Sequence, residues 1–120
     1  MKYRESEEMY LETILILSQK LGAVRSIDIA NELNYSRPSV SRAVNLLAKN
    51  GYIVIGGKGD ITFTKEGKLK AEEINQRHKI ITGVFIKMGA DKDLAEENAC
   101  RIEHVVSDEL IAVLKKFIEN

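Results

Sequence analysis

The segment from Ala99 to Glu109 contains the only cysteine of the chain and one of its two histidines. Glu103 and His104 follow Cys100 by three and four residues, so on a helix the three side chains would share one face. Thiolate favours softer divalent ions, imidazole suits iron, zinc, copper and nickel, and carboxylate also accepts manganese. A face that combines these three groups indicates a transition-metal site.

The same residues allow other interpretations. In a structural one, Cys100 packs as a small apolar side chain while Glu103 and His104 form a local polar pair. In another, Cys100 is the redox thiol of a regulator that responds to oxidants or to an organic effector. A thiol enzyme with Cys100 as nucleophile and His104 as base, or a small metalloenzyme, is disfavoured because the sequence has no phosphate loop or oxyanion motif. We therefore predict that the protein is not an enzyme.

Composition sets broad limits on the class of protein. The 120 residues are 44% hydrophobic and 30% charged, which suits one compact domain or a small domain with an oligomerisation segment. Eighteen basic and eighteen acidic residues cancel, so any interaction with nucleic acid must come from local charge patterning. No apolar run is long enough to cross a bilayer, and one cysteine cannot form an internal disulfide. We expect a cytoplasmic protein without membrane contact.

A helix is predicted over residues 6–21, with Ser6 as its cap and Gly22 as its end. Met9 and Glu12 lie one turn apart on it and could point to one place. Their plainer roles are core for Met9 and surface for Glu12.

Residues 26–33 and 37–49 form two further predicted helices, joined by a tight turn at 34–36. This arrangement is typical of a helix-turn-helix. In the second helix, Pro38 suits the first turn, and Val40, Val44 and Leu47 have the spacing of a buried stripe. The β-branched runs at 52–55 and 61–64 then predict a hairpin, or wing. The stretch from Leu33 to Gly59 has no acidic residue, and its basic residues are Arg37, Arg42, Lys49 and Lys58. Basic charge is therefore concentrated where DNA would lie.

The remainder of the chain is predicted to be helical. A long helix is predicted from about Lys65 to Met88, with a seam that suits dimerisation and consists of Ile74, His78, Ile81, Phe85 and Met88. Asp91 is expected to cap a helix that continues through Val106, and Ser107 to cap a last one. The predicted fold is mainly α with a small β-wing: a winged helix-turn-helix DNA-binding domain over residues 1–64 and a helical dimerisation and metal-binding domain over residues 65–120.

Four segments, in this order, resemble the metal-dependent repressors of the diphtheria toxin repressor and manganese transport regulator family. They are residues 8–14, 29–44, 47–67 and 99–109. The resemblance covers nearly the whole chain but not the SH3-like domain of the larger members, so a short form is expected. It implies a homodimer that binds a palindromic operator in double-stranded DNA and represses metal-homeostasis genes.

The resemblance also implies the metal ligands. A regulatory site would use Met9, Cys100, Glu103 and His104, and the methionine and cysteine are those of the iron-type members. Thioether and thiolate suit Fe²⁺ better than the harder Mn²⁺, which is the alternative, and Co²⁺, Ni²⁺ or Zn²⁺ would substitute in vitro. A second site would use His78 with Thr82 and Glu96, or Glu12 and His78 would join a manganese-type cluster.

For DNA, the resemblance implies residues at the start of the second helix of the helix-turn-helix. Ser36, Pro38, Ser39 and Arg42 match positions that approach bases or phosphates in the family. Arg37 is a further basic candidate there, and Lys58 in the wing would contact phosphate.

Overall fold

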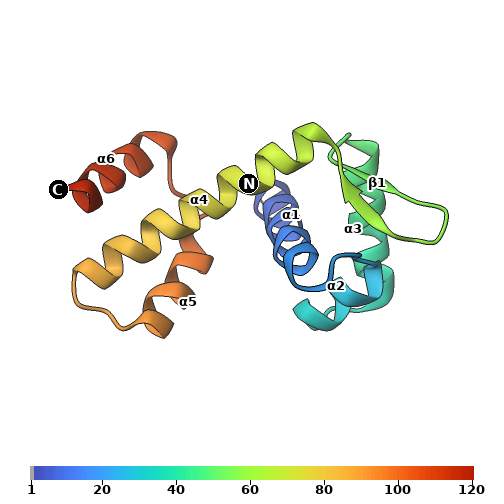
Figure 1. The fold of residues 1–120 in the computed structure, drawn as a ribbon, viewed down its shortest axis with the longest axis horizontal. Coiled ribbons are helices and arrows are strands. Elements are labelled where there is room, and N and C mark those ends of the chain that lie inside the picture. Colours follow the sequence, from blue (N-terminus) through green and yellow to red (C-terminus); the bar gives the residue numbers. More distant parts are fainter. Residues whose placement is uncertain (1) are drawn as a thin grey trace. The chain divides into compact units, whose positions relative to one another are not determined.

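The computed structural model describes residues 2–120, with side chains from Ser6 onward. Contacts divide the chain into two compact units, Lys2–Glu72 and Glu73–Asn120, called here the first and the second unit. The expected fold class, mainly α with a β-wing, is confirmed (Figure 1). The elements are α1 (Lys2–Leu21), α2 (Ser26–Leu33), α3 (Arg37–Lys49), β1 (Ile53–Ile55), β2 (Ile61–Phe63), α4 (Lys65–Lys87), α5 (Lys92–Ile102) and α6 (Asp108–Glu119).

The core of the first unit lies among α1, α2 and α3. Leu11 and Ile14 of α1 and Ile29 of α2 are fully buried or nearly so. On α3 the predicted stripe at helical spacing is confirmed, because Val40 and Val44, together with Leu47, are the buried residues of that helix. Packing of this one stripe therefore fixes α3 within the unit and leaves its opposite face exposed.

The turn between α2 and α3 agrees with the prediction. Asn34 ends α2 in the left-handed region, with φ of 57°, which asparagine tolerates better than most residues. Ser36 caps α3 by accepting a hydrogen bond from the Ser39 amide, and Pro38 stands in the first turn, where its missing N–H is no loss.

One helix start differs from the prediction, whereas α2 begins at Ser26 as expected. The helix α1 begins at Lys2, so Ser6 lies inside the helix and is not its cap. The cap of α2 is Arg25, whose backbone N–H donates to the Asp28 carboxylate at 2.9 Å. This contact satisfies the backbone N–H of the cap residue through the side chain three positions later, which is one half of a capping box.

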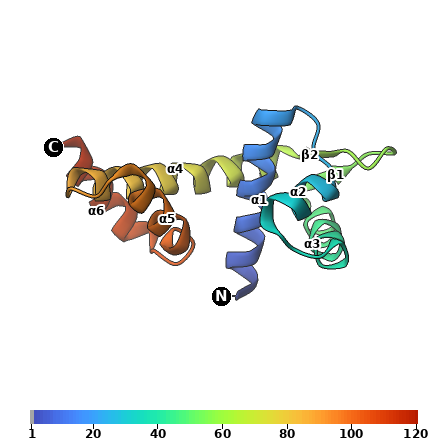
Figure 2. The ribbon, with the colours of Figure 1, turned by 90° about the horizontal axis from the view of Figure 1, so that it is seen from below.

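The wing is an antiparallel hairpin in which Ile53 pairs with Phe63 and Ile55 with Ile61. Its β2 strand is also tied to the segment between α1 and α2, because the Ile61 amide donates to the Val24 carbonyl at 2.7 Å. Ile53 and Ile61 point into the core, and the turn extends beyond the helices of the unit (Figure 2). The wing is thus anchored at its base and exposed at its tip.

The second unit contains the end of α4 together with α5 and α6. Ile74 and Ile81 of the predicted α4 seam are buried, and Ala95 and Ala99 of α5 are also buried. Met88 departs from the predicted seam: it follows the last residue of α4 and is 71% exposed. The domain boundary at residues 64 and 65 stays a prediction. Within residues 2–120, no helix is long and apolar enough to cross a membrane.

Gly67, in the first turn of α4, tests how closely that turn packs against the backbone of Tyr52 within the first unit. A Cβ atom on residue 67 would collide with the Tyr52 carbonyl oxygen, which belongs to the backbone and cannot rotate away. We expect Gly67→Ala to lower the free energy of unfolding by about 1–3 kcal/mol. Gly57→Ala is the matched control, since its Cβ would meet nothing within 4 Å and should change stability by less than about 0.5 kcal/mol. Urea unfolding of both variants measures this, and equal stabilities would contradict it.

Candidate metal centre

The predicted helix through Val106 is wrong in its length, because α5 ends at Ile102. Glu103 is the C-cap and keeps helical backbone angles, and His104 lies in the turn that follows. The caps predicted from sequence are confirmed: the Asp91 carboxylate accepts from the Leu94 amide, and the Ser107 hydroxyl accepts from the Leu110 amide. Cys100 therefore lies on a helix, whereas Glu103 and His104 stand at its end.

Arg77 of α4 holds this turn in place. Its guanidinium donates to the Glu103 carbonyl at 2.9 Å and to the Val106 carbonyl, and it forms an ion pair with Asp108 at 2.7 Å. Arg77 is 7% exposed. These contacts satisfy the carbonyl of the C-cap residue and that of Val106 in the following segment, so they hold the chain in a turn after Ile102.

Arg77 was missed in the sequence analysis, although its spacing gives a signal. It lies three residues after Ile74 and four before Ile81, which places it on the buried face of α4. A buried arginine needs carboxylate or carbonyl partners, and this requirement points to a turn packed on the helix.

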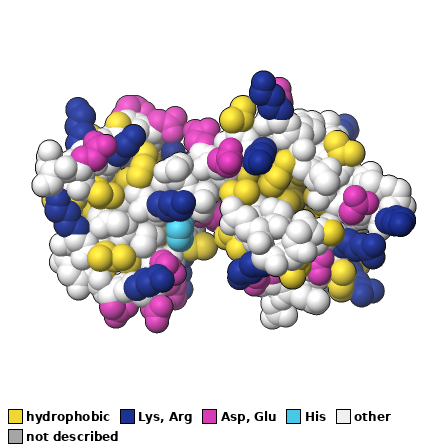
Figure 3. All heavy atoms as spheres, viewed as in Figure 1, with side chains coloured by type: hydrophobic (Ala, Val, Ile, Leu, Met, Phe, Trp, Pro, Cys, Tyr) yellow, Lys and Arg dark blue, Asp and Glu magenta, His cyan; other side chains and the backbone are white. Residues whose placement is uncertain are grey.

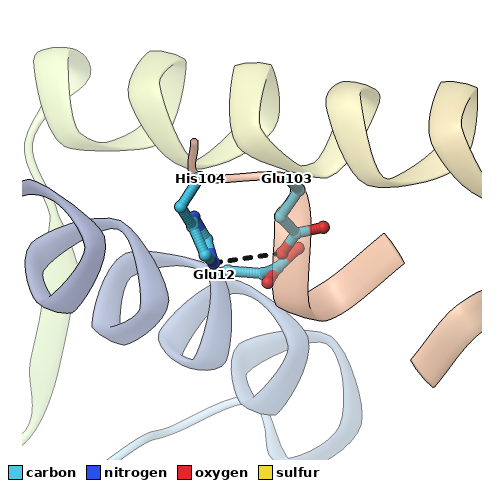
Figure 4. Close-up of side chains that lie close together, drawn as sticks. All are labelled: Glu12, Glu103 and His104. Carbon is cyan, nitrogen blue, oxygen red and sulfur yellow. Dashed lines mark ion pairs between the residues drawn. The ribbon is translucent and has the colours of Figure 1, made fainter. Parts of the chain in front are cut away.

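The carboxylate of Glu103 is the centre of the site, and it is completely buried. Its Oε2 lies 2.7 Å from Nδ1 of His78. Its Oε1 lies 3.2 Å from Nε2 of His104 (Figure 4). The contact with His104 is close enough for an ion pair, but Oε1 accepts no hydrogen bond from any residue that the structure describes. One buried carboxylate thus stands between two imidazoles.

The Glu103 carboxylate also changes the pKa of His78. The hydrogen bond to Glu103 raises the pKa of His78, against the opposing effect of partial burial. The negative charges of Glu103 and Glu96 add to the increase in pKa. The environment of His78 therefore favours positive charge beside the carboxylate.

The donor set fits a divalent cation. A buried carboxylate oxygen without a hydrogen bond is costly unless a positive group meets it, and a metal ion is one such group. Thr82, one turn beyond His78 on α4, also has a buried hydroxyl oxygen without a hydrogen bond in the described part of the chain. One carboxylate and two imidazoles therefore converge within the second unit, and one carboxylate oxygen accepts no hydrogen bond from the described residues.

The other predicted ligands lie as follows. Cys100 is exposed on α5, three residues before Glu103, and Glu96 of the same helix is half-buried. In the first unit, Met9 is half-buried on α1, and Glu12 is buried one turn further along that helix. The second unit therefore brings together His78, Glu103 and His104, whereas Cys100 stands on the exposed side of its helix.

The predicted DNA-contacting residues lie at the start of α3 and in the wing. Ser36, Arg37, Pro38 and Arg42 are exposed, as is Lys58, and Ser39 is half-buried. Arg42 donates to the Ser39 hydroxyl at 3.4 Å, and the Ser36 hydroxyl donates to the same oxygen at 2.9 Å. Lys and Arg side chains are grouped over the surface that α3 and the hairpin form (Figure 3). Fold and site together define a winged-helix regulator with a buried carboxylate and imidazole cluster.

Comparison with known proteins gives the family. Residues 2–60 match the model of the iron dependent repressor N-terminal DNA binding domain, and residues 64–120 match that of the iron dependent repressor metal binding and dimerisation domain. The transcriptional regulator MntR of Escherichia coli O6:H1 is 30% identical over 117 residues, which are 98% of this chain and 76% of MntR. The diphtheria toxin repressor of Corynebacterium diphtheriae is 31% identical, over 97% of this chain and 52% of that protein.

Among solved structures, that of the manganese regulator SloR superimposes with a TM-score of 0.81 at 27% identity, covering 94% of this chain and 53% of SloR. The chain thus spans about half the length of SloR and of the diphtheria toxin repressor. It belongs to the iron-dependent repressor family, which includes the diphtheria toxin repressor and MntR. Members of this family are metal-dependent, DNA-binding transcriptional repressors and not enzymes, and the family has a dimerisation domain.

Replacing Arg77 tests whether it anchors the turn. Arg77→Met should lower the free energy of unfolding by about 2 kcal/mol or more, because two backbone carbonyls lose their donor inside the protein. Arg101→Met is the matched control: its ion pair with Glu97 is exposed, so its loss should cost less than about 1 kcal/mol. Thermal unfolding of both variants measures this. Similar small losses would mean that the turn does not depend on Arg77.

Proposed function

We propose that this protein is a metal-activated repressor whose metal ligands come from both units. The proposed ligands are Met9 and Glu12 on α1, His78 on α4, and Cys100, Glu103 and His104 at the end of α5. The observation that carries the proposal is the buried Glu103 carboxylate between two imidazoles, with one oxygen that accepts no hydrogen bond among the described residues. A divalent cation would supply the positive charge that this oxygen lacks.

Fe²⁺ is the proposed physiological metal. The thioether of Met9 and the thiolate of Cys100 are soft ligands, which the hard Mn²⁺ ion binds poorly. Mn²⁺ remains the alternative because Glu12, Glu103 and the two histidines form a harder set. Co²⁺, Ni²⁺ and Zn²⁺ are expected to substitute in vitro. Thr82 would contribute at most a neutral hydroxyl to a second site with His78 and Glu96.

Metal would act on DNA binding through α1. If ligands on α1 and at the end of α5 hold one ion, the first unit can take only those positions that keep both sets of ligands in reach. In a homodimer, this restriction would set the spacing of the two α3 helices, which must match half-sites about 34 Å or a multiple apart. Apolar side chains for the dimer contact are available on α6, where Leu110, Val113 and Phe117 are exposed.

The operator is proposed to be a palindromic site in double-stranded DNA. Arg42 would read a base, since arginine can bind guanine through two hydrogen bonds, and Ser36, Pro38 and Ser39 would approach bases or phosphates beside it. Arg37 and Lys58 would contact phosphates and contribute affinity without sequence preference. The regulated genes would be those of metal homeostasis, and the protein would act in the cytoplasm.

A second candidate function is supported by the exposure of Cys100. An accessible thiol could be oxidised, so the same DNA-binding unit could respond to an oxidant. Peroxide sensitivity of DNA binding with no dependence on metal would favour this function over metal sensing.

The proposal is tested by selecting bound DNA from a random pool under anaerobic conditions. Three selections are run, with chelator, with Fe²⁺ and with Mn²⁺. We expect a palindromic site to be enriched with metal only, and more strongly with Fe²⁺, because metal favours the DNA-binding state of the dimer. Enrichment that ignores chelator would overturn metal activation and leave only sequence-specific DNA binding.

Glu103→Gln tests the ligand assignment with nearly no change in shape. We expect Co²⁺ binding, followed by calorimetry, to weaken at least about tenfold, because the amide has no charge to offer the cation. Metal-stimulated DNA binding should be lost in parallel. Glu97→Gln is the matched control on the exposed face of α5, and it should bind Co²⁺ like the unmodified protein. Unchanged Co²⁺ affinity in Glu103→Gln would remove Glu103 from the ligands.

A further inference from the structure

We propose that Tyr35 is a positioning residue. Through its contact with Met9, it makes the DNA-contacting start of α3 depend on whether the Met9 thioether is bound to metal. The inference rests on the proposed function, in which Met9 is a metal ligand. It goes further because it names the side chain that links metal binding by Met9 to the DNA-contacting residues of the first unit.

The geometry lies wholly within the first unit. Tyr35 is in the turn between α2 and α3, and its hydroxyl donates to Sδ of Met9 at 3.8 Å. Its ring meets that of Tyr10 edge to face, with centroids 6.4 Å apart and planes at 61°. The ring and the hydroxyl of Tyr35 therefore contact two consecutive residues of α1, and one of these is the proposed ligand.

Tyr35 is also joined to the DNA-contacting end of α3. It directly precedes Ser36, which caps α3 by accepting from the Ser39 amide. The Ser39 hydroxyl in turn accepts from both Ser36 and Arg42. A short path of one peptide link and hydrogen bonds thus leads from the Met9 sulfur to Arg42.

The hydrogen bond to Met9 is suited to switching because it is weak and accessible. A thioether sulfur is a poor acceptor, and Tyr35 is 46% exposed, so water can replace the contact at little cost. The methionine side chain has several soft torsions, which coordination to a metal would restrict. A metal that fixes the sulfur would therefore also fix the position of the hydrogen-bond acceptor of the Tyr35 hydroxyl. Because coupling between two ligands is reciprocal, DNA bound at α3 would in turn change the affinity of the site for metal.

The test uses the DNA site recovered by selection and Co²⁺ as the metal. DNA affinity is measured with chelator and with Co²⁺ for the unmodified protein, Tyr35→Phe, Met9→Leu and the double variant. Tyr35→Phe keeps the ring contact with Tyr10 and removes only the hydroxyl. Tyr52→Phe is the matched control, since its hydroxyl contacts Lys70.

We expect Co²⁺ to tighten DNA binding of the unmodified protein, and this tightening to fall about three- to tenfold in Tyr35→Phe. In the Met9→Leu background, Tyr35→Phe should cause no further loss, because the acceptor is already absent. Tyr52→Phe should respond to Co²⁺ like the unmodified protein.

Other outcomes overturn the inference in distinguishable ways. If Tyr35→Phe responds fully to Co²⁺, or loses DNA affinity equally with and without Co²⁺, Tyr35 has no coupling role although metal activation stands. If Co²⁺ does not tighten DNA binding of the unmodified protein, the proposed function fails, and the inference fails with it.

A readout without metal or DNA tests the contact itself. With carbon-13 label on the methionine methyl groups, the Met9 resonance is identified by its loss in Met9→Leu. Tyr35→Phe should shift this resonance in the metal-free protein, and Tyr52→Phe should not. An unshifted resonance in Tyr35→Phe would overturn the contact on which the coupling depends.

Discussion

The buried carboxylate of Glu103 is the constraint on which the second unit depends. Removing a carboxylate from water is costly unless positive or donor groups surround it, and here His78 supplies a hydrogen bond at 2.7 Å. The backbone around Glu103 is held separately by Arg77, which bonds the carbonyls of Glu103 and Val106. The fold thus provides a fixed turn and leaves the charge of its carboxylate only partly compensated. A cation would therefore compensate charge that the described side chains leave uncompensated.

In the first unit, polar contacts hold α1 to the end of α3 and to the start of α4. Glu7 of α1 accepts from Lys70 at 2.8 Å and from Asn50 at 3.3 Å. These contacts join three elements within one unit. A restraint applied to α1 would therefore act on α3 as well, rather than being absorbed by bending between the helices.

Local patterns in the sequence predicted the features that local interactions determine. The buried stripe of α3, the proline in its first turn and the caps at Asp91 and Ser107 depend on residues a few positions apart, and all are confirmed. The end of α5 was not predictable in this way, because Arg77 reaches Glu103 from 26 residues away. The contact of Tyr35 with Met9 likewise joins residues 26 apart in the chain. Spacing placed Glu103 and His104 close together, but only the packed unit shows that His78 shares the same carboxylate.

The size of an allosteric effect explains why weak contacts matter in such a protein. Coupling between two ligands is typically about 1–3 kcal/mol, which corresponds to roughly 5- to 150-fold in affinity. That is the net contribution of one or two hydrogen bonds, about 0.5–1.5 kcal/mol each. The contacts of Arg77 and Glu7 hold the two units in their folds and need not change for coupling of this size. A metal can therefore alter DNA binding by changing marginal contacts, such as the one between Tyr35 and Met9, while the core of each unit stays as it is.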